Sequence, residues 1–153
     1  MAQLALSLLG PLQVSLDGVP AAGFESQKGR ALLAFLSLEA ERPHARDALA
    51  GLLWPNQPDQ HARKKLRQAL ANLRQTLGDK RATPPYLHIT RDTIQFNRAS
   101  NHQLDVLAFC DHLAACDQHR HRHPETCRTC ARRLQQVAAL YRGTFLDQFF
   151  LDD

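Results

Sequence analysis

Apolar and polar residues alternate on both sides of an early Gly10-Pro11 pair. Leucines occupy positions 4, 6 and 8, and apolar side chains return at positions 12, 14 and 16. A period of two places every second side chain on one face, which is typical of strands with one buried side. Asp17-Gly18 then favours a tight turn, because glycine reaches positive φ without steric cost. We therefore predict a small N-terminal antiparallel sheet, with a short third strand within residues 19–24.

A helical period replaces this alternation after Ser26, whose side-chain oxygen suits an N-cap. The spacing predicts a helix over residues 27–41, which Arg42-Pro43 ends. A second, shorter helix is predicted over residues 44–53, with leucines at 49, 52 and 53 on its apolar face. Trp54 follows it, and we expect this side chain to fill the core rather than to serve as a stacking surface.

The third predicted helix, over residues 61–77, is the most informative stretch of the chain. Its apolar residues have the spacing of one buried stripe: Ala62, Leu66, Ala69, Leu70, Leu73 and Leu77. The other face contains no acid and carries Arg63, Lys64, Arg67, Gln68, Ala71, Asn72, Arg74 and Gln75. Like charges at this spacing repel one another, so a negatively charged partner explains the face more simply than solvent does. The alternative interpretation is an ordinary surface helix that happens to be basic.

A second pair of short alternating segments follows at residues 86–97. Apolar residues alternate on both sides of a polar turn, and Arg91 lies near its tip. The predicted elements follow one another in a characteristic order: sheet, helix, helix, basic helix and hairpin. This order is typical of a winged helix-turn-helix with a leading sheet. We therefore predict an α+β fold, with a winged helix-turn-helix DNA-binding domain over residues 1–98 and an all-α hairpin over residues 102–153.

Positive charge is concentrated on one part of the chain. The net charge of the 153 residues is +4, yet residues 61–91 hold eight Lys or Arg and a single acid, Asp79. Such a patch indicates a polyanion bound at one place. DNA suits it better than a membrane, because the basic helix lacks bulky aromatic anchors. The chain has no apolar run of ~18 residues and no signal peptide at its start, so we expect a cytoplasmic protein.

All four cysteines lie in the last third of the chain, interleaved with histidines. We predict one helix over residues 102–118 and another that begins at Pro124. Three thiols and one imidazole suit a tetrahedral Zn²⁺ ion. The predicted ligands are Cys116, Cys127, Cys130 and either His121 or His119.

Such a zinc site would be structural, because four protein ligands leave no open position for catalysis. Buried thiols without a metal, beside a solvated histidine-rich loop, explain the same pattern, so no cofactor is certain. A thiol-dependent enzyme is disfavoured, because no strand leads into the Cys-x2-Cys pair. We expect a protein without enzymatic activity.

Long motifs in the chain resemble one family of bacterial regulators. LLGPLQVSLDG, KGRALLAFLSLEAERPHARDALAGLLWP and ARKKLRQALANLRQTLGD are similar to the N-terminal region of SARP-type transcriptional activators, whose DNA-binding part is an OmpR/PhoB-like winged helix. LDVLAFCDHL and RRLQQVAALYRGTFLDQF resemble the start of the bacterial transcriptional activation domain (BTAD), a TPR-like helical array. The family's array is longer than the segment present, so we expect the chain to be the N-terminal part of a larger protein.

The resemblance implies a sequence-specific DNA-binding module of a transcriptional regulator. Its third helix (61–77) would lie in the major groove of double-stranded DNA and its wing (86–97) at the minor groove. Carried over by position, the DNA-facing residues are Lys64, Lys65, Arg67, Gln68, Ala71, Asn72, Arg74 and Arg91. The terminal helices would contact RNA polymerase, other domains of the parent protein, or a second protomer on DNA. The alternative function is a protein-interaction adaptor, with a degenerate winged helix and a zinc-stapled helical hairpin.

Overall fold

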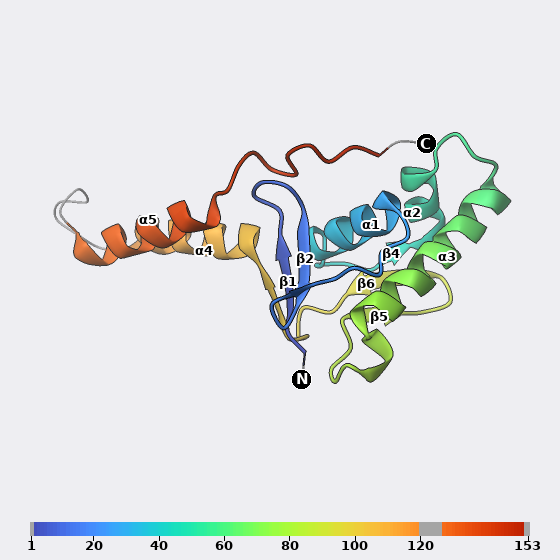
Figure 1. The fold of residues 1–153 in the computed structure, drawn as a ribbon, viewed down its shortest axis with the longest axis horizontal. Coiled ribbons are helices and arrows are strands. Elements are labelled where there is room, and N and C mark those ends of the chain that lie inside the picture. The colour runs from blue at the N-terminus through green and yellow to red at the C-terminus, as the bar shows by residue number, and fades with distance from the viewer. Residues whose placement is uncertain (1, 120–126, 152–153) are drawn as a thin grey trace. The chain divides into compact units, whose positions relative to one another are not determined.

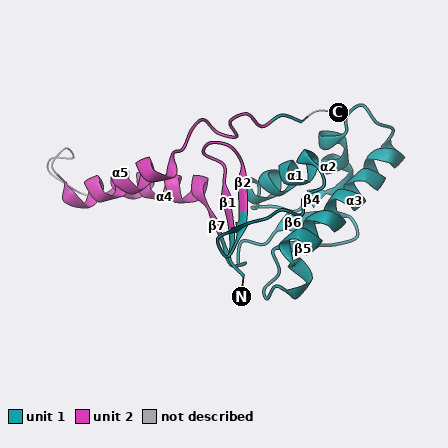
Figure 2. Cartoon of the chain, viewed as in Figure 1, with its two compact units in different colours: residues 1–4, 15–102, 150–153 teal, residues 5–14, 103–149 magenta. Residues whose placement is uncertain are grey.

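The computed structural model describes residues 2–119 and 127–151 (Figure 1). They form two compact units that interleave in sequence (Figure 2). The first comprises residues 1–4, 15–102 and 150–153, and the second comprises residues 5–14 and 103–149. Among the helices described, none combines the length and the apolar character that crossing a bilayer requires.

The predicted N-terminal sheet is confirmed. Its strands are β1 (Leu4–Ser7), β2 (Gln13–Leu16), β3 (Val19–Pro20) and β7 (His102–Leu104), in the order β3-β2-β1-β7. Leu16 pairs with Val19 across a two-residue turn. The turn residues, Asp17 and Gly18, have φ angles of 51° and 80°, which is the geometry that makes Asp-Gly a hairpin signal.

Three helices follow in the first unit: α1 (Gln27–Leu38), α2 (Arg46–Leu53) and α3 (Asp59–Leu77). The predicted N-cap is confirmed, because the Ser26 hydroxyl accepts a hydrogen bond of 3.3 Å from the backbone N–H of Gly29. Helix α3 begins two residues earlier than predicted and ends where expected, at Gly78. This glycine has a φ of 64°, and its N–H bonds back to the last turn of α3.

Three further helix boundaries were predicted wrongly. Helix α1 ends at Leu38 rather than at residue 41, where Glu39 is its C-cap, and short strands take the first residues of two other predicted helices. His44–Ala45 form β4, which pairs with β6 (Thr93–Phe96), so α2 begins only at Arg46. His44 is also held by its ring, since Nε2 lies 2.7 Å from the carbonyl oxygen of Glu39. Likewise, His102–Leu104 form β7, so the predicted helix over residues 102–118 begins at Asp105.

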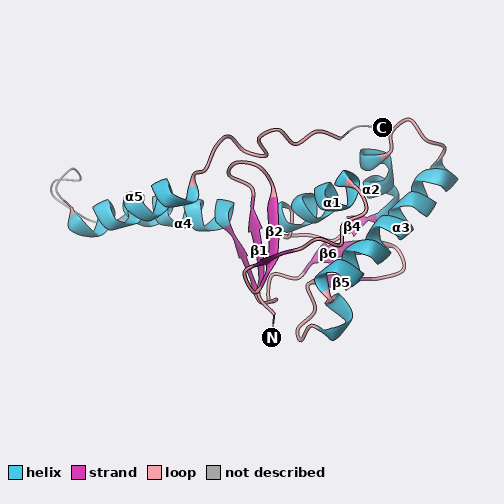
Figure 3. Ribbon diagram, viewed as in Figure 1, coloured by secondary structure: helices cyan, strands magenta, loops and turns pink. Residues whose placement is uncertain are grey.

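The predicted second hairpin is confirmed by β5 (Leu87–Ile89) and β6, which pair antiparallel. With β4 they form a three-stranded sheet in the order β4-β6-β5. Figure 3 shows the three helices of the first unit gathered beside this sheet. The short 3₁₀ turn η1 (Asp79–Arg81) leads from α3 towards β5.

The whole apolar stripe of α3 is buried in the core of the first unit. All six residues of the predicted stripe are buried, none with more than 9% of its surface exposed. Trp54 is 7% exposed, as expected for a core side chain. Helix α3 packs on both α1 and α2, which leaves its opposite face turned away from the core.

The second unit is built on a helical hairpin of α4 (Asp105–Gln118) and α5 (Arg128–Leu140). Asp105 is buried, and its carboxylate accepts hydrogen bonds of 2.9 Å from the backbone N–H groups of Leu8 and Leu9. The later segment returns to the same loop, where Phe145 forms bridges with Leu9 and Gly10. Pro124, the predicted start of the second helix, lies outside the described residues.

Candidate functional site

The polar face of α3 presents most of the residues predicted to contact DNA. Lys64, Lys65, Arg67, Gln68 and Ala71 are all exposed, because burial of the apolar stripe fixes which way the helix faces. Arg91, in the turn between β5 and β6, is exposed as well. The fold therefore offers one cationic helix face and one cation on the hairpin.

Residues of α3 and of the β5–β6 hairpin line the same groove, which has a volume of about 600 Å³. It is lined by α3, by the start of α2 and by the β5–β6 turn. Four of its lining residues are arginines: Arg46, Arg63, Arg67 and Arg91. Two of these, Arg67 and Arg91, come from separate predicted DNA-contacting elements, so the first unit places both cations on a single concave surface.

Arg46 is a groove residue that the sequence patterns missed. A guanidinium nitrogen of Arg46 donates to the carbonyl oxygen of Thr90 at 2.8 Å, and its backbone N–H donates to that of Asp92 at 2.9 Å. These bonds tie the start of α2 to the hairpin turn. Their partners lie more than 40 residues away, so no local pattern could have indicated them.

Arg63, also in the groove, is held by an acid. Its Nε lies 2.7 Å from an oxygen of Asp47, and a second nitrogen lies 3.1 Å from the other oxygen. This hydrogen-bonded pair, and then its charge attraction, raise the pKa of Arg63 above the usual value. Because Asp47 already neutralises Arg63, the groove offers less free positive charge than its arginine count suggests.

Asn72 and Arg74, two predicted DNA-contacting residues, make contacts within the protein. Asn72 donates to the carbonyl oxygen of Gly23 at 2.8 Å and accepts from the N–H of Glu25 at 3.1 Å. Arg74 Nε lies 3.3 Å from a carboxylate oxygen of Asp79. Both side chains therefore hold neighbouring segments in place.

The Arg74 side chain is held by Asp79, a buried carboxylate with several hydrogen-bond partners. Asp79 is only 2% exposed, and one of its oxygens accepts from the backbone N–H groups of Tyr86 and Leu87 at 2.8 and 3.1 Å. A buried carboxylate needs such partners. Asp79 thus joins the end of α3 to the start of the hairpin, a role that the sequence patterns did not indicate.

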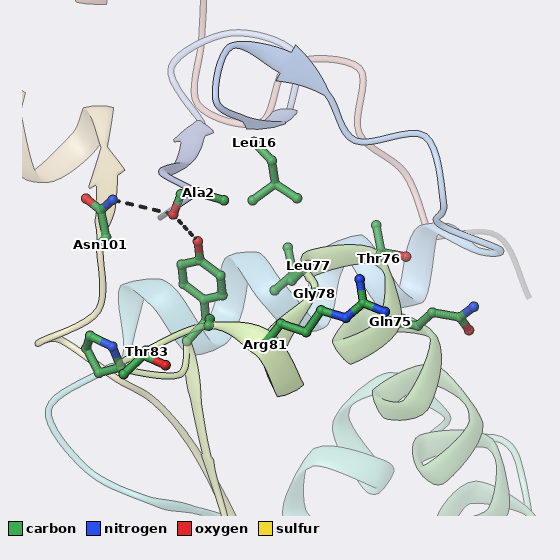
Figure 4. Close-up of a pocket in the computed structure, with 12 residues that line it drawn as sticks. Ala2, Leu16, Gln75, Thr76, Leu77, Gly78, Arg81, Thr83 and Asn101 are labelled. Carbon is green, nitrogen blue, oxygen red and sulfur yellow. Dashed lines mark hydrogen bonds between the residues drawn. The ribbon is translucent and has the colours of Figure 1, made fainter.

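A separate cavity of about 360 Å³ lies at the end of α3 (Figure 4). Residues of this helix end line it together with Ala2, Leu16 and Asn101. The Tyr86 hydroxyl, also in its lining, donates to the carbonyl oxygen of Ala2, and burial is the main cause that raises the pKa of Tyr86. The lining contains no carboxylate, histidine or cysteine, so Tyr86 and Arg81 are its titratable side chains.

In the second unit, α4 and α5 bring together three of the residues considered for a metal site. His119 Nδ1 lies 3.3 Å from Cys130 Sγ and 3.4 Å from Cys127 Sγ. The three ligand atoms all lie within 4.8 Å of one another. Cys116 Sγ lies 3.8 Å from the carbonyl oxygen of Cys130. His121, the first-named histidine candidate, lies outside the described residues.

The two thiols of the Cys-x2-Cys pair differ in their surroundings. Cys127 is the N-cap residue of α5, and the backbone N–H of Cys130 is the main cause that lowers its pKa. Cys130 is 3% exposed, and burial raises the pKa of its thiol to about 11. The cluster therefore combines one thiol with a lowered pKa and one with a raised pKa.

Comparisons with known proteins point to transcriptional regulators. No protein-family model matches the chain. The transcriptional regulatory protein EmbR of Mycobacterium tuberculosis is 41% identical over 76 residues, which cover 50% of this chain and 19% of EmbR. MoaR1 of the same organism, also a transcriptional regulatory protein, is 37% identical over 73 residues, covering 48% of this chain and 23% of MoaR1.

The fold comparison extends over almost the whole chain. The solved structure of M. tuberculosis EmbR in complex with a low-affinity phosphopeptide matches with a TM-score of 0.77 and 28% identity. The match covers 97% of this chain and 38% of the EmbR chain.

The fold and the exposed basic helix together define a winged-helix module that is similar to part of known transcriptional regulators. Similarity to EmbR and MoaR1 in sequence, and to EmbR in structure, confirms the resemblance to the N-terminal region of SARP-type regulators. The sequence matches span about a fifth of each relative's length. Both relatives are transcriptional regulatory proteins by name.

Proposed function

We propose that this chain is the sequence-specific DNA-binding module of a bacterial transcriptional regulator. In this proposal α3 enters the major groove of double-stranded DNA, and the β5–β6 hairpin is a wing at the minor groove. The observation that carries it is the shared groove, where Arg67 of the helix and Arg91 of the hairpin line the same concave surface. A duplex lying there would meet both cations at once.

The exposed residues divide by chemistry into two groups. Lys64, Lys65, Arg67 and Arg91 would neutralise phosphates and release counterions, giving most of the affinity and a strong dependence on salt. Gln68 would pair with the major-groove edge of adenine, and the Ala71 methyl would contact the methyl of thymine. Both lie on the exposed face of α3.

Asn72 and Arg74 are already engaged by partners within the protein. Asn72 is bonded to Gly23 and Glu25, and Arg74 to Asp79. We therefore propose that they position α3 and the segments around it, and that the exposed residues nearer the helix start make the main DNA contacts.

The division of labour along the chain is also a proposal. Residues 1–98 would bind DNA, and residues 102–153 would begin the BTAD-like helical domain. Exposed apolar side chains on the hairpin, including Leu107, Leu134 and Tyr141, suit contact with further helices. Such helices would belong to RNA polymerase, to the rest of the parent protein or to a second protomer.

The test is a binding measurement on DNA from upstream of the protein's own operon. The site is first located by footprinting, and affinity is then measured by fluorescence anisotropy over a range of salt concentrations. Arg67→Ala and Arg91→Ala should each weaken binding by about 1–3 kcal/mol if the arginine reads a base, or lower the salt slope by about one if it contacts a phosphate.

Arg132→Ala is the matched control, because Arg132 is an exposed arginine on α5. It should leave both affinity and salt slope unchanged. Equal affinities for the wild type and for a double variant lacking Arg67 and Arg91 would reject the proposal and favour the adaptor function.

A further inference from the structure

We propose that Cys116, His119, Cys127 and Cys130 bind one Zn²⁺ ion, which closes the end of the α4–α5 hairpin. This site is independent of DNA binding and lies entirely within the second unit. His119 is the histidine that the described residues bring to the thiols.

Distances in the cluster fit a tetrahedral ion. With Zn–S bonds of about 2.3 Å and Zn–N bonds of about 2.0–2.1 Å, a tetrahedral site separates its sulfur and nitrogen ligands by roughly 3.5 Å. His119 Nδ1 lies 3.3 and 3.4 Å from the two thiol sulfurs of Cys130 and Cys127. One imidazole nitrogen facing two thiols at this spacing has the arrangement of three corners of a zinc tetrahedron.

Cys116 is the residue placed to supply the fourth corner. It lies in the last turn of α4, opposite the start of α5, and its sulfur already touches the carbonyl of Cys130. Turning this thiol from the carbonyl towards the cluster would complete a Cys₃His set, which is a common structural zinc site. Arg133 donates to the carbonyl of Ala115 at 3.1 Å, so a cation lies close to the negative charge that three thiolates would add.

The hairpin also has a physical need for such an ion. Helix α4 buries only Asp105 among its residues, and α5 buries only Cys130 and Val137. Leu113 and Leu134 are 36% and 50% exposed. Two helices with so little apolar burial gain little from the hydrophobic effect, and small units of this kind often depend on a structural metal.

The first experiment measures metal in the whole 153-residue chain, purified in reducing buffer without added zinc. We expect about one zinc per chain by elemental analysis, as a structural site predicts. Replacement by Co²⁺ should give the absorption of a tetrahedral thiolate-bound ion. A stoichiometry near zero, both as purified and after titration with Zn²⁺, would overturn the proposal, as would a Cys127–Cys130 disulfide found by mass spectrometry in the same buffer.

Single variants then test the ligand set. Cys116→Ser, His119→Gln and Cys127→Ser should each weaken zinc binding by at least roughly tenfold, the loss that removal of a ligand's hydrogen-bond partner alone can cause. None of these side chains is fully buried, so the substitutions themselves should be tolerated, and circular dichroism compares each variant with the metal-free wild type. Cys130→Ser is not among these variants, because its thiol is buried and the substitution could itself disturb the packing.

Cys110→Ser is the matched control, since Cys110 is an exposed thiol on α4 outside the cluster. It should bind zinc as the wild type does, and equal losses in all four variants would overturn the assignment. Full zinc binding by Cys116→Ser alone would remove Cys116 from the ligand set and overturn the Cys₃His proposal. Because the readout is metal content, failure of the DNA-binding proposal would leave these results unchanged.

Discussion

Helix α3 and the α4–α5 hairpin differ in how much of their apolar surface they bury. Helix α3 buries every apolar residue of its stripe against α1, α2 and their surroundings. The hairpin leaves Leu107 and Leu134 about half exposed and is held instead by polar groups, namely the Asp105 carboxylate at one end and the Cys/His cluster at the other. The difference shows that an amphipathic pattern fixes which face a helix can bury, while the packing partners decide how much is buried.

This contrast also separates two kinds of functional surface. On α3, complete burial of one face holds the other in a fixed orientation, as the proposed insertion into a DNA groove would require. On the hairpin, the exposed apolar side chains would themselves form the contact surface in the proposed function. Four predictions test the contrast, in order of decreasing effect.

The largest effect is expected from Leu66→Ala in the middle of the α3 stripe. Leu66 is 1% exposed, so truncation should lower the free energy of unfolding by about 2–5 kcal/mol through lost burial and a cavity. Urea denaturation followed by Trp54 fluorescence measures it. Leu134→Ala, at a half-exposed position of α5, is the control and should stay within about 0.5 kcal/mol of wild type. Equal losses at the two sites would contradict the contrast.

Asp105→Ala should be the most damaging single change to the second unit. It removes a charged acceptor from two backbone N–H groups that lie in a buried setting. The expected cost is about 3 kcal/mol, because bonds to charged groups are strong and the orphaned donors stay desolvated. Hydrogen exchange at Leu8 and Leu9 reports it directly. Asp105→Asn keeps one acceptor and should lose less; unchanged exchange in Asp105→Ala would show that these bonds contribute nothing.

Asn72→Ala should cost about 1 kcal/mol, because two hydrogen bonds to the segment before α1 are lost at a partly exposed site. Gln68→Ala, on the exposed face of the same helix, should leave stability unchanged but weaken binding to the cognate site. Comparing the two by denaturation and by anisotropy separates positioning from DNA contact. A larger loss of specific affinity in Asn72→Ala, with full stability, would reverse these assignments.

The smallest effect is expected from Asp47→Ala, which breaks the ion pair with Arg63. Both side chains are more than half exposed, at 54% and 68%, so solvent and salt screen the attraction and stability should not change measurably. Release of Arg63 should instead strengthen binding to DNA at low salt, since one more free cation faces the groove. Weaker binding in Asp47→Ala would show that the pair is needed to position Arg63.

Local signals in the sequence determined much of the fold. The stripe of α3, the Ser26 cap, the Asp17-Gly18 turn and the second hairpin were all predicted from neighbours within a few residues, because helix periodicity, capping and tight turns are local in origin. The exposed cationic face of α3 follows from the same stripe, so the exposure of most candidate residues on this helix was predictable as well.

Only the tertiary structure decided the remaining features. His44–Ala45 and His102–Leu104 became strands because partner strands far along the chain pair with them. Arg46 and Asn72 acquired their roles from backbone groups more than 40 residues away. Asp79 and Arg74 were drawn into contacts with groups five to eight residues away. The spacing of cysteines and histidines had already indicated a cluster, and the packing of α4 and α5 brings His119 to the two thiols. The strand pairings and the contacts of Arg46 and Asn72 are set by long-range contacts, for which a linear pattern of residues carries no signal.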